Sequence, residues 1–339
     1  MGNREAQRDA QRRMDTAARG GRYRIGVDLG GTKIEAALMS PDGEIVETRR
    51  VPTPQGDYSG TLAAIRELVG ALEVSLAAPA RVGVGMPGAM SPHTGTVQNA
   101  NSVVLNQRAL DSDLSALLER PVRLANDADC FALSEATDGA AAGAGTVFGV
   151  ILGTGVGGGV VVRGQLLAGP NAIAGEWGHN PLPDSEVDGG SAPICWCGRR
   201  GCVETYLSGP GMAADFWRAE NASKTMLEVA GQAGVIEKKS PDAEQILRLA
   251  ETGHAGALQC VNRYIDRLAR ALSMVINILD PDVIVLGGGL SNISRLYEDV
   301  PARWSETIFA PAVRTRLVPP AYGDASGVRG AAWLWPAEE

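Results

Sequence analysis

The sequence lacks the features that mark secreted and membrane proteins. No apolar run reaches the roughly 18 residues that a membrane-spanning helix needs. Residues 1–22 hold six arginines and no apolar core, so they do not resemble a secretory signal. The five cysteines are odd in number and unevenly placed, which argues against a disulfide framework. We therefore expect a cytoplasmic protein that does not bind membranes.

An excess of positive charge is missing as well. The formal net charge is -8 at pH 7, which argues against nucleic acid as the main partner. The 339 residues are 45% hydrophobic and 21% charged, enough for one large or two ordinary globular domains. Residues 1–22 are basic and poor in large apolar side chains. We expect them to form a disordered tail, with a functional basic arm as the alternative.

Two stretches of the sequence share one plan of strands and glycine-rich turns. Residues 23–51 indicate a strand, a glycine-rich turn, a strand, an Asp-Gly turn and a strand. Residues 146–169 repeat this plan with an Arg-Gly turn, and the segment GVDLG from Gly26 aligns with GVILG from Gly149. The repeat predicts a duplicated α/β domain whose copies face each other across a cleft. Chance resemblance between glycine-rich hairpins is the alternative.

Three glycine-rich turns follow predicted strands, the third after a long helical pattern over residues 255–279. Glycine lets backbone N–H groups approach a phosphate closely, so three such turns predict one extended polyphosphate ligand. Residues 153–158 fit G-x-G-x-x-G, but they lead into a strand pattern and not into a helix. Residues 31–33 read Gly-Thr-Lys, the reverse of the Gly-Lys-Thr order of a P-loop. Ordinary tight turns are the alternative.

Asp28 lies in the first of these turns, beside the expected phosphates. A carboxylate there would repel the phosphates unless a Mg²⁺ ion lies between them, often with water as the direct ligand. The sequence therefore predicts a magnesium site at Asp28.

Four motifs together resemble the ROK family, which contains sugar kinases and sugar-responsive repressors. They are DLGGTK at 28–33, GTGVGGG at 153–159, GEWGH at 175–179 and CWCGRRGCVETYLSG at 195–209. The resemblance covers residues 23–338 and implies an α/β, actin/hexokinase-like (ribonuclease H-like) fold of two duplicated lobes. Further segments, such as GVRGAAWLWP at 327–336, resemble the bacterial fructokinase and manno(fructo)kinase branch. The N-acetylglucosamine kinases are the next nearest group.

The stretch RLANDADCFALSEA at 123–136 is expected to pass from a strand into a helix. The resemblance implies that Asp127 is the catalytic base and that Asn126 binds a sugar hydroxyl. Spacing alone favours a helix cap, the common use of such residues. The family usually has Asn at the position of Asp129, and a second carboxylate facing Asp127 would raise its pKa. We expect Asp129 to face solvent.

The resemblance also implies the rest of the sugar site and a metal site. Cys195, Cys197 and Cys202 with His179 form a Cys₃His set that suits structural, tetrahedral Zn²⁺. Iron–sulfur clusters normally take four thiolates, and buried free thiols are the remaining alternative. With four protein ligands the zinc has no open position, so it is not the Lewis acid of the reaction. The residues expected to contact the sugar, besides Asn126 and Asp127, are Gly88, Asn101, Glu176, His179 and Glu204.

We expect an ATP-dependent hexose kinase, most strongly a fructokinase that makes D-fructose 6-phosphate and also accepts mannose. The same chemistry on glucose, N-acetylglucosamine or N-acetylmannosamine is the first alternative. A repressor is disfavoured, because about 24 residues precede the first strand and a helix-turn-helix needs many tens. The residues expected to bind ATP with Mg²⁺ are Asp28, Gly30, Gly31, Thr32, Lys33, Gly153, Thr154, Gly155, Gly157, Gly287, Gly288 and Gly289.

Two lobes are expected after the tail. The first covers residues 23–122, with a C-terminal helix at 324–339 returning to pack on it. The second covers residues 123–323 and includes a zinc-binding insertion at 176–209. The resemblance further implies a homodimer, with ATP and a hexose as the ligands.

Overall fold

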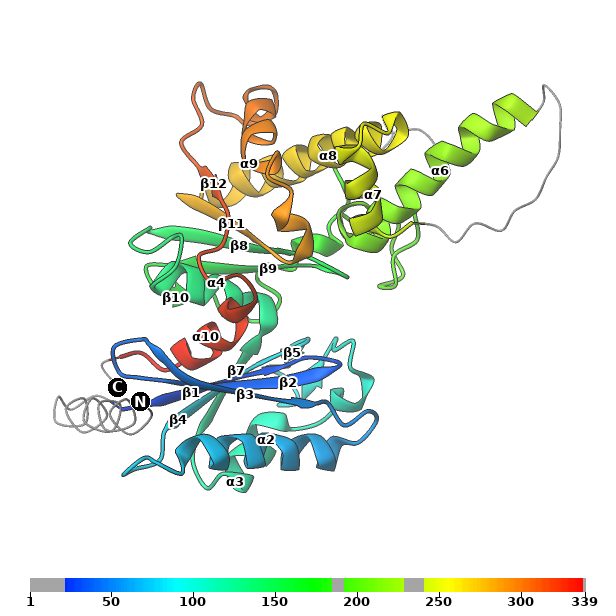
Figure 1. Ribbon diagram of the computed structural model, residues 1–339. Coiled ribbons are helices and arrows are strands. Elements are labelled where there is room, and N and C mark those ends of the chain that lie inside the picture. The colour runs from blue at the N-terminus through cyan, green and yellow to red at the C-terminus, as the bar shows by residue number, and fades with distance from the viewer. Residues whose placement is uncertain (1–21, 185–191, 229–240, 338–339) are drawn as a thin grey trace, which may run out of the picture. The chain divides into compact units, whose positions relative to one another are not determined.

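The computed structural model describes residues 22–184, 192–228 and 241–337 (Figure 1). The expected tail at 1–22 therefore lies outside the described residues, apart from Arg22. The chain divides into two compact units, one formed by residues up to 143 with 159–174 and 321 onward, the other by 144–158 and 175–320. Among the described helices, none combines the length and the apolar character needed to cross a membrane.

The first unit is built on a mixed five-stranded sheet in the order β3-β2-β1-β4-β7. The strands β1 (Arg24–Leu29), β2 (Lys33–Met39) and β3 (Ile45–Pro52) pair antiparallel, as the two predicted turns require. The strands β4 (Arg81–Met86) and β7 (Val122–Asn126) continue the sheet parallel to β1. The other elements of this unit are α2 (Tyr58–Glu73), β5 (Ala89–Met90), β6 (Val97–Gln98), η1 (Val103–Leu105), α3 (Leu110–Leu117), α4 (Asp127–Thr137), η6 (Gly323–Ala325) and α10 (Ser326–Trp333).

The second sheet repeats this plan in the order β10-β9-β8-β11-β12 (Figure 1). Its first three strands in the chain are β8 (Thr146–Leu152), β9 (Val156–Val162) and β10 (Gln165–Leu166), and the boundary between the units falls inside β9. The strands β11 (Val283–Gly287) and β12 (Arg316–Val318) follow parallel to β8. Both sheets therefore have the same order of strands, and the duplicated actin/hexokinase-like α/β fold is confirmed.

Helices dominate the remainder of the second unit. The longest, α8 (Ala255–Leu279), has the bounds of the apolar pattern in the sequence and ends at Asp280 in a left-handed conformation with φ of 48°. Such an αL residue is a common way to terminate a helix. The other elements are η2 (Trp177–His179), α5 (Glu204–Leu207), α6 (Gly209–Glu228), α7 (Ala243–Glu251), η4 (Gly289–Asn292), α9 (Leu296–Asp299) and η5 (Pro301–Glu306).

The compact units differ from the lobes expected from the sequence in residues 123–143, 159–174 and 321–323, which belong to the first unit and not to the second. Residues 123–143 join the first unit because β7 pairs with β4 and α4 packs against α10. The expected zinc segment at 176–209 lies in the second unit, with 185–191 outside the described residues.

Helix α10 packs against β1, β4 and α4 through glycines that allow backbone to touch backbone. A Cβ added at Gly26 of β1 would lie 1.9 Å from the carbonyl oxygen of Val328. A Cβ at Gly330 would lie 1.6 Å from the carbonyl oxygen of Cys130. Real Cβ atoms do not approach this closely, so even one methyl group at these positions forces the helix away.

We expect Gly26→Ala to lower the free energy of unfolding by about 3 kcal/mol, because the added methyl overlaps the backbone of α10. Urea unfolding of the purified protein measures this change. The matched control is Gly70→Ala in the exposed interior of α2, where an added Cβ meets nothing within 4 Å. That control should gain about 0.5–1 kcal/mol from its better helix propensity. Equal stabilities for both variants would contradict the packing described.

Candidate active site

The carboxyl ends of three parallel strands of the first unit share one edge of the sheet. Asp28 lies near the end of β1, Gly88 follows β4 by two residues, and Asn126 ends β7. The Nδ2 of Asn126 donates to the carbonyl oxygen of Gly88 at 3.0 Å. Ligands of open α/β sheets bind at such carboxyl ends, so this edge is one part of the candidate site.

Asn126 and Asp127 stand where β7 passes into α4, as the sequence predicts. The Oδ1 of Asn126 accepts a hydrogen bond from the N–H of Ala128 at 2.9 Å, so the helix-cap interpretation is confirmed for Asn126. The Asp127 side chain is open to solvent, yet nearby protein atoms raise its pKa by desolvation. Hydrogen bonds from the backbone and from Asn126 oppose this rise, and Asp129 is not among the causes of the shift.

Gly88 and Asn101 lie on the loops beside this edge. Gly88 has φ of +78°, and a Cβ there would lie 2.5 Å from the carbonyl oxygen of Gln98, so the position requires glycine. Asn101 is exposed and follows Ala100, whose N–H and carbonyl both bond the Asn106 side chain at 2.9 Å. The backbone beside Asn101 is therefore held in place while its own side chain faces solvent.

The turn between β1 and β2 is closed by a hydrogen bond from Gly30 N–H to the Lys33 carbonyl at 3.0 Å. It exposes Gly31, Thr32 and Lys33. Asp28, just before the turn, has its pKa raised to about 6 by burial, with further contributions from the negative charges of Asp127 and Glu35. Lys33 partly opposes this rise. A cation beside Asp28 would relieve the repulsion between these carboxylates, so the cluster fits a divalent metal ion.

We expect Asp28→Asn to stabilise the protein at pH 8 and not at pH 4. The raised pKa means that ionisation of Asp28 costs folding free energy, so stability falls as the pH rises from about 4 through about 6. Asparagine removes this cost, about 1–3 kcal/mol, only above that window. Urea unfolding at pH 4 and pH 8 measures it, and a gain of equal size at both pH values would contradict the raised pKa.

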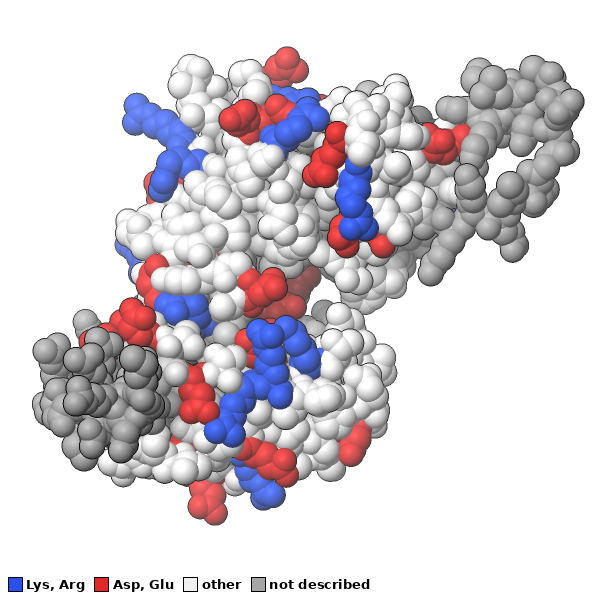
Figure 2. Space-filling model, viewed as in Figure 1, with Lys and Arg blue, Asp and Glu red and all other residues white. Residues whose placement is uncertain are grey.

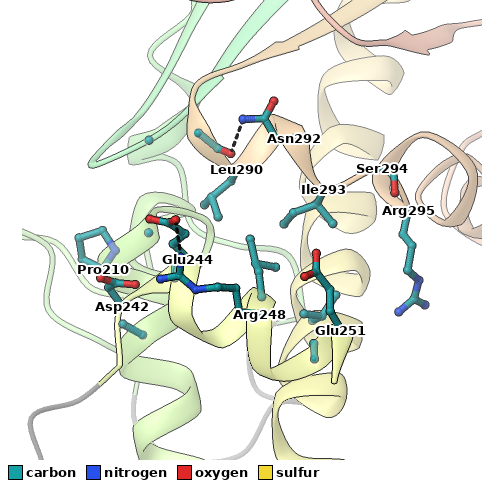
Figure 3. A pocket seen from close by; sticks show the side chains of 18 of the residues that line it. Pro210, Asp242, Glu244, Arg248, Glu251, Leu290, Asn292, Ile293, Ser294 and Arg295 are labelled. Atoms are coloured by element: carbon teal, nitrogen blue, oxygen red, sulfur yellow. Dashed lines mark hydrogen bonds and ion pairs between the residues drawn. The ribbon is translucent and has the colours of Figure 1, made fainter. Parts of the chain in front are cut away.

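Two glycine-rich turns of the second unit follow the neighbouring parallel strands β8 and β11. A cavity of about 980 Å³ opens beside them, and Gly153, Thr154 and Gly289 are among its lining residues (Figure 3). Gly288 has φ of +79°, and a Cβ there would lie 2.5 Å from the carbonyl oxygen of Leu152. Of the ATP residues expected in the second unit, Gly155, Gly157, Gly287 and Gly288 do not line this cavity.

Apolar side chains and charged side chains both line the cavity. In Figure 3, Glu244 and Arg248 of α7 lie on one side, and Leu290 and Ile293 lie on the other. Arg248 Nη1 donates a hydrogen bond to Glu244 Oε1 at 2.8 Å. Such a slot suits a flat heteroaromatic base. The sequence did not reveal these residues, because the apolar and charged residues that line such a cavity have no fixed spacing along the chain.

His179, Cys195, Cys197 and Cys202 come together as the sequence predicts, with all four ligand atoms within 4.8 Å of one another. Cys197 Sγ lies 3.7 Å from Cys202 Sγ, and Cys195 Sγ lies 3.6 Å from His179 Nδ1. Tetrahedral zinc, with Zn–S bonds of about 2.3 Å and Zn–N bonds of about 2.0–2.1 Å, separates two sulfurs by about 3.8 Å and a sulfur from a nitrogen by about 3.6 Å. These two spacings fit that geometry.

Glu204 lies next to this cluster, at the first turn of α5. Its Oε2 accepts a hydrogen bond from Val156 N–H at 3.0 Å, and its Oε1 accepts one from Trp196 Nε1 at 2.6 Å. A Cβ at Gly155 would lie 2.8 Å from Glu204 Oε2, so a larger residue there would displace the carboxylate. Glu176 is exposed and immediately precedes η2, which ends at His179. The cluster and the proposed sugar ligands of this unit are therefore neighbours.

The expected site residues thus fall into two groups, each defined within its own unit. The first unit holds Asp28, Gly88, Asn101, Asn126 and Asp127 together with the turn at 30–33, and the second unit holds the other expected residues. On the face shown in Figure 2, Lys and Arg side chains are interspersed with Asp and Glu, and neither sign covers the face.

Comparison with known proteins gives consistent matches over nearly the whole chain. The sequence profile of the ROK family matches residues 24–338. An N-acetyl-D-glucosamine kinase of Yersinia enterocolitica is 39% identical over 313 residues, which cover 91% of this chain and 98% of that protein. The ROK hexokinase of Thermus thermophilus has a similar crystal structure, with a TM-score of 0.76 at 27% identity, covering 91% of this chain and 96% of that chain.

A further solved structure is a ROK family glucokinase from Streptomyces griseus in complex with glucose and AMPPNP. It has a TM-score of 0.71 at 27% identity and covers 92% of this chain and 98% of that chain. The relatives therefore match the chain in both sequence and fold over nearly its full length.

Proposed function

The chain belongs to the ROK family and is a sugar kinase of that family, and from this premise we propose that it phosphorylates N-acetyl-D-glucosamine with ATP. The observation that carries the choice of sugar is the 39% identity, over 91% of the chain, with an N-acetyl-D-glucosamine kinase. The fructokinase expected from short motifs has weaker support, because the alignment with the N-acetylglucosamine kinase spans nearly the whole chain.

In this proposal the nucleotide base occupies the apolar slot between α7 and the segment 290–295. The phosphates follow the turn at 153–155 and the turn at 30–33. Backbone N–H groups in such turns bind phosphate oxygens without the bulk of side chains. Asp28 is the carboxylate that would hold the Mg²⁺ of the nucleotide, and that ion would neutralise charge on the transferred phosphoryl group.

Asp127 is the proposed proton acceptor. As the sugar hydroxyl oxygen forms its bond to the γ-phosphorus, its proton passes to the Asp127 carboxylate and the bond from phosphorus to the ADP oxygen breaks. The raised pKa of Asp127 makes this carboxylate a better base than an ordinary aspartate. Asn126 has its Oδ1 occupied in capping α4, and its Nδ2 fixes the Gly88 carbonyl. Both bonds hold the backbone around Asp127.

Glu176, His179 and Glu204 are the proposed hydroxyl ligands in the second unit. His179 can serve both the metal and the sugar, because its Nδ1 faces Cys195 and its Nε2 is a separate ring atom. A structural zinc ion bound by His179 and the three cysteines would fix the orientation of that ring. The backbone pairing of Pro181 with Cys202 and the bond from Val203 N–H to the Asn180 carbonyl, 2.9 Å, tie the same two segments together.

A coupled assay of ADP production tests the function. The protein should have its highest kcat/KM with N-acetylglucosamine when this sugar, glucose, mannose, fructose and N-acetylmannosamine are compared under identical conditions. A higher kcat/KM with fructose would return the assignment to the fructokinase branch. Absence of turnover with every sugar, together with binding of operator DNA, would instead favour a repressor.

We also propose that the protein is a cytoplasmic homodimer, as its family resemblance implies. Sedimentation velocity at micromolar concentration tests this state.

A further inference from the structure

Trp196 is an exposed aromatic residue in the loop that carries the three cysteines of the Cys₃His cluster, with 68% of its surface open to solvent. It lies between two cluster residues, Cys195 and Cys197, and a turn at Gly198 follows with φ of +85°. The Cys195 N–H donates to the Arg199 carbonyl at 2.8 Å, and the Gly198 N–H donates to the Cys195 carbonyl at 3.0 Å. The backbone of Trp196 is therefore held on both sides.

The indole ring of Trp196 is held as well. Its Nε1 donates to Glu204 Oε1 at 2.6 Å, and its ring meets the His179 ring edge-on with centroids 5.0 Å apart. The N–H of an exposed tryptophan can bond to water, so it does not need a protein acceptor. The hydrogen bond to Glu204 therefore restricts a side chain that would otherwise be free to move. Aromatic side chains commonly line ligand-binding sites.

Glu204 is held from two directions by this arrangement. Val156 N–H occupies Oε2 and Trp196 occupies Oε1, and the two donors belong to different elements, the start of β9 and the cluster loop. Cys195 Sγ also lies 3.9 Å from Oε1, so of the roughly four acceptor positions of a carboxylate the second position on Oε2 remains for a hydroxyl donor. Trp196 thus orients the carboxylate and leaves capacity for a ligand.

We propose that Trp196 is a positioning and specificity residue of the sugar site, a role that rests on the proposed function. Its N–H orients Glu204 toward the sugar hydroxyls, and its open ring face packs against the apolar C–H surface of the pyranose. Neither role is part of the phosphoryl transfer itself. The residue acts through sugar affinity and leaves the proton transfer to Asp127 unchanged.

The test compares Trp196→Phe with a matched control, Trp217→Phe, which alters another exposed tryptophan in α6. The phenylalanine at position 196 keeps one aromatic ring, removes the N–H donor and reduces the ring surface that can pack against the sugar. We expect its KM for N-acetylglucosamine to rise about tenfold, the effect of losing one hydrogen bond to a charged group. The kcat, the KM for ATP and the zinc content should stay within about twofold of wild type. The control should match wild type throughout.

Tryptophan fluorescence gives a second measurement that does not depend on turnover. Addition of N-acetylglucosamine should change the emission of the wild type and of Trp217→Phe, and most of that change should be absent in Trp196→Phe. A Trp196→Phe protein with the KM and the emission change of wild type would overturn the proposal. An unchanged KM together with a loss of zinc would also overturn it, since Trp196 would then serve the metal loop. An unchanged KM together with altered sedimentation would place Trp196 at an interface between subunits and would overturn it as well.

Failure of the proposed function looks different from failure of this inference. If the wild type neither turns over nor shows an emission change with any sugar of the panel, the kinase assignment fails. If the wild type is active and Trp196→Phe is indistinguishable from it, only the role of Trp196 fails.

Discussion

Asp127→Asn is expected to lower kcat by about 10²- to 10⁴-fold while sugar binding is retained. Asparagine has the shape of aspartate but cannot accept the hydroxyl proton. The fold should tolerate the change, because Asp127 is open to solvent and its charge contributes to the raised pKa of Asp28. Steady-state kinetics give kcat, and isothermal titration calorimetry with the sugar gives the binding constant.

Asp129→Asn is the matched control, since it removes a second carboxylate from the same first turn of α4. The raised pKa of Asp127 comes from desolvation, so removal of the Asp129 charge should leave this base in place and keep kcat within about threefold of wild type. Near-normal turnover in Asp127→Asn would remove Asp127 from the role of base. An equal loss in both variants would mean that the helix terminus as a whole is needed, and not one proton acceptor.

Cys202→Ala is expected to reduce the zinc content from one equivalent to near zero and to lower the thermal midpoint. A structural zinc ion contributes folding free energy directly, and removal of one of four ligands opens the site. The sugar KM should also rise, because the segments carrying His179 and Glu204 are joined at this cluster. Elemental analysis, thermal unfolding and steady-state kinetics measure the three effects.

Cys260→Ala is the control for the zinc prediction. Cys260 is equally buried, but it lies in α8 and its Sγ faces the carbonyl oxygen of Met212. That variant should retain its zinc and its sugar KM. Because Cys202→Ala could fail to fold, chelation of the wild type gives an independent measurement: removal of zinc should lower the thermal midpoint, and added zinc should restore it. Unchanged zinc in purified Cys202→Ala would contradict the ligand set.

Elements with strong local patterns could be predicted from the sequence. The alternation of apolar residues around the Asp-Gly turn and the Arg-Gly turn predicted both hairpins, and Arg163 and Gly164 do adopt positive φ of 52° and 76°. The pattern over 255–279 predicted α8 with its observed bounds. The cysteine spacing at 195–202 brings three ligands together within one turn, so only His179 had to come from elsewhere.

Other features could not be predicted because they depend on residues distant in sequence. The slot for the nucleotide base combines α7 with residues 290–295, and neither segment carries a motif. The expected boundary at 122/123 placed Asp127 in the second lobe, whereas β4–β7 pairing keeps it in the first unit. The choice of sugar also depends on a pocket surface, so short motifs favoured fructose and the comparison over the whole chain favours N-acetylglucosamine.

The sequence by itself determined the strands, the turns, the cysteine cluster and the family, because these follow from short-range periodicity and from spacing along the chain. Only the tertiary structure decided that Asp28 and Asp127 lie close enough to affect one another, and that Trp196 bonds Glu204. The physical reason is that a pKa shift or a side-chain hydrogen bond depends on distances of a few ångströms between separate elements. Those distances are fixed by strand register and by packing, and neither can be predicted from the residues of a single segment.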